Sequence, residues 1–127
     1  MESVGMMDLS FYKGKRFCFK GSWMSVMLTN VGTEVIGYSS CSKTEASLFD
    51  LCGVKDQITH IKGDVQELNH LLEVFRTYQP EIVIHMAAQP IVRDSYNDPV
   101  GTYSTNFIGT VNICEAVRQA PFVRSFF

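Results

Sequence analysis

The feature with the clearest chemical meaning is a turn that contains a single glycine, Gly21. It lies between a short apolar run and a pattern typical of an amphipathic helix. In dinucleotide-binding folds this turn carries three glycines, because its backbone must approach a pyrophosphate closely at the N-terminus of the helix. With only one glycine, the turn either keeps part of a phosphate-binding loop or does no more than begin the helix.

Small and polar residues follow two further apolar runs. Ser39 comes after the run at residues 34–38, where many dinucleotide folds have an acid for the ribose hydroxyls. No acid stands there, so a ribose contact would fall to Ser39. Ala87 and Ala88 come directly after the run at residues 82–86. Their small side chains would let the backbone lie close to a bound nucleotide. Alternatively, the two alanines make room for a helix.

The hydrophobic pattern predicts the elements that must position these residues. Short apolar runs predict strands, and apolar spacings of three and four predict helices. The expected strands cover residues 16–19, 34–38, 58–61, 82–86 and 122–127. The expected helices cover residues 22–30, 66–78 and 100–120, with a short helical turn at 47–51 and a polar connection at 89–99. The run at 82–86 is apolar apart from His85, as expected for a strand covered on both faces.

Strands that alternate with helices at this spacing predict βαβ units, right-handed crossovers and a mainly parallel sheet. The expected fold class is α/β, a Rossmann-type doubly wound sheet, incomplete, with its first five strands in the order 3-2-1-4-5. Residues 1–10 are expected to form an N-terminal tail, and residues 11–127 a partial dinucleotide-binding domain.

Composition excludes several classes of partner. A formal net charge of -2, with acids and bases interspersed, gives no basic face for nucleic acid. The apolar stretches fall far short of the roughly 20 residues that a membrane-spanning helix needs, and the N-terminus does not resemble a signal peptide. We therefore expect a cytoplasmic protein. The 4 cysteines show no metal-binding or redox spacing, and we expect them to be buried, reduced thiols.

Three longer strings resemble a known family. Residues 19–23 read F-K-G-S-W, residues 85–90 read H-M-A-A-Q-P, and residues 105–110 read T-N-F-I-G-T. The first two resemble the CDP-glucose 4,6-dehydratases of the extended short-chain dehydrogenase/reductase superfamily, and the third is shared across that superfamily. The resemblance spans residues 11–127. It implies an NAD-dependent lyase that converts CDP-glucose to CDP-4-keto-6-deoxyglucose in deoxysugar biosynthesis.

The resemblance also implies roles for residues that would hold the cofactor. Phe19 and Lys20 belong to the phosphate loop, and Ser39, Ala87 and Ala88 lie along the cofactor's path. Asp64 and Val65 match a G-D-V turn that holds adenine, with the carboxylate accepting from the exocyclic amine. Alternatively, Asp64 only caps the helix that begins near Gln66, since aspartate is a favoured N-cap.

Further roles concern the helix at 100–120 and the segment before it. Asn106 matches an asparagine that bends its helix and holds a proton-relay water near the catalytic pair. The expected substrate-binding residues are Gln89, Arg93, Ser95 and Tyr96. Arg93 can pair with a phosphate, or it can be a solvated loop arginine. His85 is expected to be a core histidine with its hydrogen bonds satisfied rather than a ligand.

Two departures from the family pattern concern activity. The chain lacks about half a dozen residues at the end of its first strand, including the first two glycines of the dinucleotide fingerprint. No tyrosine in the sequence has a lysine four positions later, although the family uses such a pair as its base for oxidation. We therefore expect no catalytic residue here, no metal, and an inactive chain.

Two alternatives to a dehydratase remain open. The chain could be a non-catalytic Rossmann remnant that serves as a binding or dimerising module, or a relative of another nucleotide-sugar epimerase or dehydratase. The expected partners are a nucleotide sugar, CDP-glucose by family, and a second copy of the chain through the helix at 100–120. Neither nucleic acid nor a membrane is expected.

Overall fold

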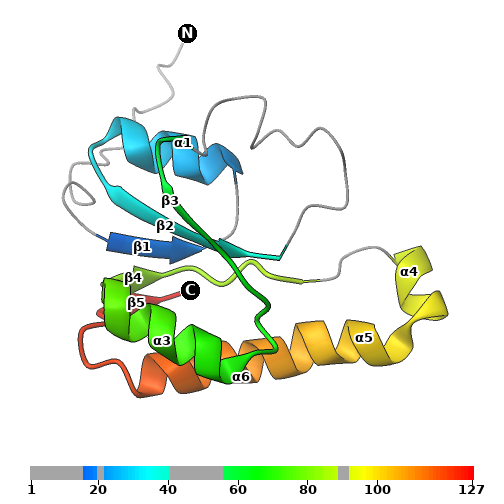
Figure 1. The fold of residues 1–127 in the computed structure, drawn as a ribbon. Coiled ribbons are helices and arrows are strands. Elements are labelled where there is room, and N and C mark those ends of the chain that lie inside the picture. Colours follow the sequence, from blue (N-terminus) through cyan, green and yellow to red (C-terminus); the bar gives the residue numbers. More distant parts are fainter. Residues whose placement is uncertain (1–15, 20–21, 41–55, 89–91) are drawn as a thin grey trace, which may run out of the picture.

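The computed structural model describes residues 16–19, 22–40, 56–88 and 92–127 (Figure 1). These residues form one sheet with helices on both faces. The expected tail at 1–10 and the helical turn at 47–51 lie outside the described residues.

The sheet is parallel throughout and has the predicted strand order. It runs β3-β2-β1-β4-β5, so the chain moves outward from β1 and then continues on the other side of β1. The switch point of this doubly wound sheet therefore lies between β1 and β4. The strands are β1 (Arg16–Phe19), β2 (Glu34–Ser39), β3 (Thr59–Lys62), β4 (Ile82–Val83) and β5 (Ser125–Phe126).

Alternate residues of β2 face opposite sides of the sheet, as the pleat requires. On one side Val35 packs with Leu28 of helix α1 (Ser22–Asn30). On the other side Tyr38 joins a larger core with helices α3 (Leu68–Tyr78) and α6 (Gly109–Arg118). Figure 1 shows α1 on one side of the strands and α3 with α6 on the other.

Left-handed residues end two of these helices. Gly32, with φ 78°, follows α1, and its N–H donates to the Thr29 carbonyl at 3.0 Å. Gln79, with φ 46°, caps α3 and donates to the Phe75 carbonyl at 2.9 Å. Pro80 follows Gln79 and cannot continue the helix, as the sequence predicts.

The fourth strand is shorter than expected. We predicted a strand over residues 82–86, covered on both faces, but only Ile82 and Val83 pair with their neighbours, and Met86 is 50% exposed. The partner strand β5 spans only two residues, so the ladder ends there. Beyond Val83 one further backbone bond joins the two segments, from the His85 N–H to the Phe127 carbonyl at 2.7 Å.

The predicted polar connection at 89–99 contains a helix. Helix α4 (Val92–Asn97) forms there, and Asp98 then caps helix α5 (Pro99–Tyr103) by accepting from the Gly101 N–H at 2.9 Å. An aspartate followed by proline is a strong helix start, because proline suits the first helical position.

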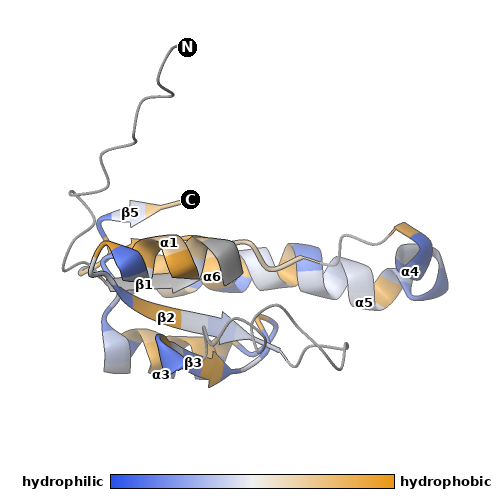
Figure 2. Cartoon of the chain, turned by 90° about the horizontal axis from the view of Figure 1, so that it is seen from above, coloured by the Kyte–Doolittle hydropathy of each residue, from blue (hydrophilic) through white to orange (hydrophobic). Residues whose placement is uncertain are grey.

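The predicted helix at 100–120 is not a uniform α-helix. A π-helical segment, Ser104–Ile108, separates α5 from α6. In both views the helical stretch from α4 to α6 projects past the carboxyl ends of the strands (Figures 1 and 2). Within the described ranges, every helix is too short or too polar to span a bilayer.

Candidate functional site

The carboxyl ends of the parallel strands lie along one edge of the sheet. Cys18 pairs with Val83, so Phe19 at the end of β1 lies beside the segment that continues β4. This is the crevice in which doubly wound sheets bind ligands. Ala87 packs against the core with α3 and α6, whereas Ala88 is exposed. Two predicted site residues of this region, Lys20 and Gln89, lie outside the described residues.

The turn from β3 to α3 holds Asp64. Its carboxylate Oδ1 accepts from the Gln66 N–H at 2.9 Å, and its other oxygen makes a longer contact of 3.4 Å with the Gln66 side-chain amide. Helix α3 begins later, after Glu67, whose side chain makes no capping bond. The expectation that Asp64 caps this helix is therefore wrong. Asp64 closes the turn before it and leaves a carboxylate oxygen at the edge of the sheet.

Tyr38 holds this turn through a hydrogen bond from its side chain. Its side chain is 4% exposed, and its hydroxyl donates to the Asp64 carbonyl at 3.0 Å. Nδ1 of His70 lies 3.2 Å from the same hydroxyl, which can accept from it because its own proton goes to Asp64. A Cβ at Gly63 would collide with the Tyr38 ring. The sequence suggested no partner for Tyr38 or His70, because the residues lie 32 positions apart.

Ser39 points to the opposite face from Tyr38. The Ser39 hydroxyl lies 2.9 Å from Nε2 of His60 on β3. In the sheet register, Ser39 pairs with Lys62 of β3. His60 and Lys62 are exposed, and Ser39 is half-buried. The structure thus brings the predicted ribose residue together with two basic side chains that the sequence did not link to it.

Val65 is held against helix α6. Its side chain is 7% exposed and would collide with a Cβ at Gly109, whose ideal position is 2.5 Å from Val65 Cγ2. The buried Asn112 amide donates to the Val65 carbonyl at 2.9 Å. Little of the Val65 side chain is thus accessible beside Asp64. Asn112 was missed, although Gly109, Asn112 and Ala116 form a helical stripe of small and polar residues.

Asn106 lies in the π-helical segment, which locally widens the helix that the resemblance expected it to bend. Its carbonyl accepts from the Thr110 hydroxyl at 2.7 Å. That hydroxyl lies 2.9 Å from His85 Nε2 and, with its proton donated, accepts from the His85 ring. Burial lowers the pKa of His85, which favours the neutral ring. Its ring nitrogen has a partner, but the residue is half-buried, so the expectation that His85 belongs to the core is wrong.

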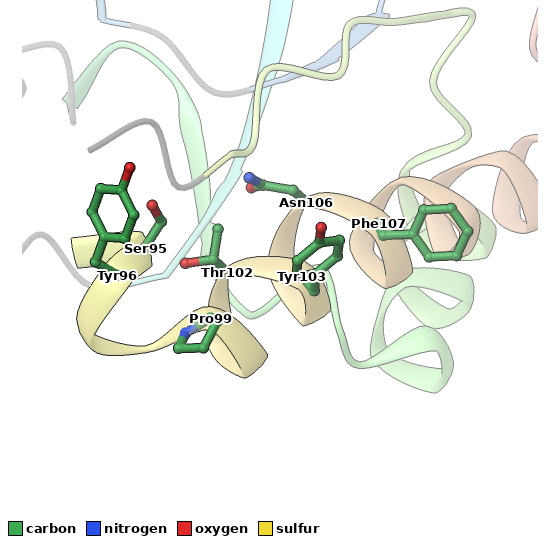
Figure 3. A pocket seen from close by; sticks show the side chains of 7 residues that line it. All are labelled: Ser95, Tyr96, Pro99, Thr102, Tyr103, Asn106 and Phe107. Atoms are coloured by element: carbon green, nitrogen blue, oxygen red, sulfur yellow. The ribbon is translucent and has the colours of Figure 1, made fainter. Parts of the chain in front are cut away.

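Helix α4 carries three of the predicted substrate-binding residues. Ser95 and Tyr96 line a hollow of about 600 Å³ between α4 and the following helical stretch, and Asn106 lines it too (Figure 3). Arg93 is exposed on the same helix and does not line the hollow. The Ser95 hydroxyl donates to the Val92 carbonyl at 2.6 Å. The remaining lining residues are Pro99, Thr102, Tyr103 and Phe107.

The structure tests the expectation about cysteines at one residue. Cys114 is exposed, so the expectation of buried cysteines is wrong for this residue, because it lies on the outer side of α6. No group of three or more potential metal ligands occurs in the part of the chain that the structure describes.

Comparison with known proteins gives a consistent set of relatives. A family model described as GDP-mannose 4,6 dehydratase matches residues 18–126. The chain is 41% identical to CDP-glucose 4,6-dehydratase of Salmonella typhimurium over 126 residues, which cover 94% of this chain and 35% of that protein. The chain therefore spans about a third of the length of this relative.

Solved structures share the fold. An epimerase from Methanothermobacter thermautotrophicus has a TM-score of 0.77 at 23% identity, covering 92% of this chain and 35% of its own. The UDP-glucose 4-epimerase of Thermus thermophilus, solved with NAD, has a TM-score of 0.70 at 24% identity, covering 83% of this chain and 34% of its own. With the family match along residues 18–126, the chain belongs to the GDP-mannose 4,6 dehydratase family, among the epimerase- and dehydratase-type short-chain dehydrogenases/reductases.

Proposed function

We propose that this chain forms the dinucleotide-binding part of an NAD-dependent dehydratase that acts on CDP-glucose. The observation that carries the proposal is its 41% identity to CDP-glucose 4,6-dehydratase along 94% of the chain. The strings at residues 19–23 and 85–90 lie within the stretch that matches the family. Such an enzyme supplies 4-keto-6-deoxy precursors of deoxysugars, and we assign it to the cytoplasm with its nucleotide-sugar substrate.

The side chains at the sheet edge fit the adenosine end of NAD. One Asp64 oxygen is held by the Gln66 N–H, and the other can accept from the exocyclic amine of adenine. Ser39 and His60 offer a hydroxyl and an imidazole to the ribose hydroxyls. When bound, NAD would supply the oxidant for the C4 hydroxyl of the sugar and the hydride that later reaches C6.

The hollow beside α4 supports a place for the nucleotide sugar. Ser95, Tyr96 and Asn106 offer polar groups around one space, and Arg93 on the same helix can pair with a phosphate. In this proposal Asn106 also holds a water for proton transfer. The catalytic pair would have to come from outside these 127 residues, because no tyrosine here has a lysine four positions later.

Calorimetric titration with two dinucleotides tests the cofactor part of the proposal. We expect the chain to bind NAD about tenfold more tightly than the analogue in which hypoxanthine replaces adenine. Hypoxanthine has a carbonyl in place of the exocyclic amine, so the Asp64 carboxylate would face it without a hydrogen-bond donor. In Asp64→Asn the single oxygen stays on the Gln66 N–H and the amide NH2 faces the base. The preference should therefore reverse, since hypoxanthine offers a carbonyl.

Glu73→Ala, on the exposed side of α3, is the matched control and should leave both affinities unchanged. An absence of NAD binding by the folded chain would refute the cofactor assignment. Equal affinity for both dinucleotides would refute the role of Asp64.

A chimera tests the substrate. Residues 18–126 of this chain would replace the matching part of the Salmonella enzyme, and turnover would be measured with CDP-glucose, UDP-glucose and GDP-mannose. We expect turnover of CDP-glucose, and none by the 127-residue chain alone. A folded chimera that prefers another nucleotide sugar would contradict the assignment.

A second candidate function is a non-catalytic dimerising module. The exposed apolar side chains along α5 and the π-helical segment favour it: Tyr103 is 75% and Phe107 is 65% exposed. Both candidates predict self-association, but only the first predicts NAD binding with the Asp64-dependent preference.

A further inference from the structure

The turn between β3 and α3 contacts the helical stretch from α5 to α6 at three points. Val65 meets Gly109, and the Val65 carbonyl accepts from the Asn112 amide at 2.9 Å. The third contact is made by Gln66, whose side-chain amide donates to the Thr105 hydroxyl oxygen at 3.3 Å. Positions 105, 109 and 112 follow at spacings of four and three, so one side of the helical stretch faces the turn.

The Gln66 amide also contacts the turn itself. Its nitrogen lies 3.4 Å from Oδ2 of Asp64, the carboxylate oxygen that the proposed adenine contact uses. An amide NH2 group carries two hydrogens, so one can go to Asp64 and the other to Thr105. Both contacts, at 3.4 and 3.3 Å, are longer than the usual hydrogen bond of about 2.9–3.0 Å. One amide therefore spans two acceptors and holds each of them weakly.

A new donor at Asp64 would change this balance. The exocyclic amine of adenine would compete with the Gln66 amide for Oδ2, while Oδ1 stays on the Gln66 backbone N–H at 2.9 Å. The bond to Thr105 can then shorten, because the amide no longer has to reach in two directions. Thr105 directly precedes Asn106, which lines the hollow beside α4. The contact therefore joins the adenine end of the proposed site to the hollow.

The helical segment that Gln66 contacts has an unusual backbone. In its π-helical turn the Gly109 N–H donates to the Ser104 carbonyl, five residues earlier. Such turns are rare and occur mostly at functional sites. Gly109 is buried against Val65, whereas Thr105 is held from the turn by an exposed amide. A firmer bond at Thr105 would therefore limit how far the next residue can move.

We propose that Gln66 is a positioning residue that couples the two ends of the site. An adenine nucleotide at Asp64 releases the Gln66 amide from the carboxylate, strengthens its bond to Thr105 and orders the segment that carries Asn106 into the hollow. The inference rests on the proposed dinucleotide-binding function and adds to it a coupling between cofactor and nucleotide sugar. Such coupling is reciprocal, so a ligand in the hollow would in turn favour adenine binding.

Amide hydrogen exchange followed by NMR tests the coupling in the whole chain. The probe is 5′-AMP, which carries the adenine end of NAD without its nicotinamide half. With 5′-AMP saturating, we expect exchange at residues 104–108 to slow about fivefold or more. At equal occupancy 5′-IMP should not slow it, because its carbonyl would accept from the Gln66 amide instead of displacing it.

Two variants each remove one end of the bond. Gln66→Ala and Thr105→Val should keep the affinity for 5′-AMP within about threefold, because the backbone N–H of residue 66 still holds Asp64. Both should lose the slowing at residues 104–108. Asn69→Ala, exposed on α3, is the matched control and should keep it.

Three results would overturn the coupling and leave the proposed function standing. They are 5′-AMP binding without slower exchange at residues 104–108, equal slowing by 5′-IMP, and equal slowing in the two variants. If 5′-AMP fails to bind, the coupling is overturned as well. If NAD also fails to bind, the cofactor assignment falls with it.

Discussion

At the scale of single residues, the turn that presents Asp64 is built by its neighbours. The Tyr38 side chain extends from β2 to the turn, where its hydroxyl donates to the Asp64 carbonyl. The Gly63 N–H donates to the Ser39 carbonyl at 3.0 Å. Only glycine fits at position 63, because the Tyr38 ring fills the space of a Cβ. A buried tyrosine thus sets the position of a half-buried aspartate.

Replacing Gly63 with alanine should destabilise the chain. We expect the free energy of unfolding to fall by about 2 kcal/mol, because the added methyl must displace the buried Tyr38 ring. Urea titration followed by circular dichroism measures the change. Glu73→Ala, on the exposed side of α3, should shift the free energy by less than about 0.5 kcal/mol. A neutral result for Gly63→Ala would mean that Tyr38 is free to move.

The stability of the chain should also depend on His85. Burial lowers the pKa of this ring below its ordinary value of 6.5, so the unfolded chain binds a proton that the folded chain resists. The free energy of unfolding is therefore unaffected by the titration of His85 above pH 6.5, and it falls as the pH drops below that value, because the unfolded chain then takes up the proton more readily. Acidification should therefore lower the urea midpoint.

His85→Gln can still donate to Thr110 but does not titrate, so it should show a smaller loss of stability on acidification. Urea midpoints at about pH 7.5 and about pH 5.5 give the comparison. Equal losses in the variant and the parent would assign the pH dependence to other groups.

At the scale of elements, helix α6 lies close to the β3–α3 turn. Gly109 meets Val65 without an intervening side chain, and Asn112 satisfies the Val65 carbonyl. One turn earlier the π-helical segment carries Asn106 to the hollow beside α4. Asn106 and Phe107 leave the helix in different directions in Figure 3. The same helical stretch thus contributes to the core through Gly109 and to the hollow through Asn106.

Alanine at position 109 should lower stability even though it favours helix formation. The gain in helix propensity is about 1 kcal/mol, and overpacking against Val65 costs about 1–3 kcal/mol. We expect a net loss, seen as a lower melting temperature. Adding Val65→Ala to Gly109→Ala should cost less than Val65→Ala does alone, because the second alanine then fills vacated space. Additive losses would show that the two residues do not press on each other.

At the scale of the whole molecule, an apolar surface lies along the outer side of α5, the π-helical segment and α6. Tyr103, Phe107 and Val111 are exposed there, while Asn112 and Ala116 of α6 face the core. Exposed apolar groups of this kind mark interaction sites. We expect a second copy of the chain to cover this surface, because a two-fold axis beside the helix would bury both apolar stripes at once.

Phe107→Glu should therefore convert a dimer into a monomer, since a carboxylate would be buried in an apolar interface. Sedimentation equilibrium of the chain and the variant measures the change, and we expect dissociation to become at least about tenfold easier. Val92→Glu, exposed on α4, adds the same charge away from this surface and should leave the association unchanged. A parent chain that is monomeric at high concentration would contradict the dimer.

The periodicity of the sequence determined most of the framework. Strands and helices follow from local spacing, and parallel order 3-2-1-4-5 follows from their alternation. The edge that carries Ser39 and Asp64 could be located because Ser39 ends β2 and Asp64 closely follows the end of β3. These features depend on residues close together in the chain, so the local hydrophobic spacing predicts them.

Only the tertiary structure decided what surrounds those residues. The contacts of Tyr38 with Asp64 and of Ser39 with His60 join separate strands and turns, and no spacing encodes them. Packing also decided which face of α6 is buried. Gly109, Asn112, Ile113 and Ala116 are buried, and Gly109 meets Val65 too closely for a larger side chain at that position. Tyr103, Phe107 and Val111 are exposed.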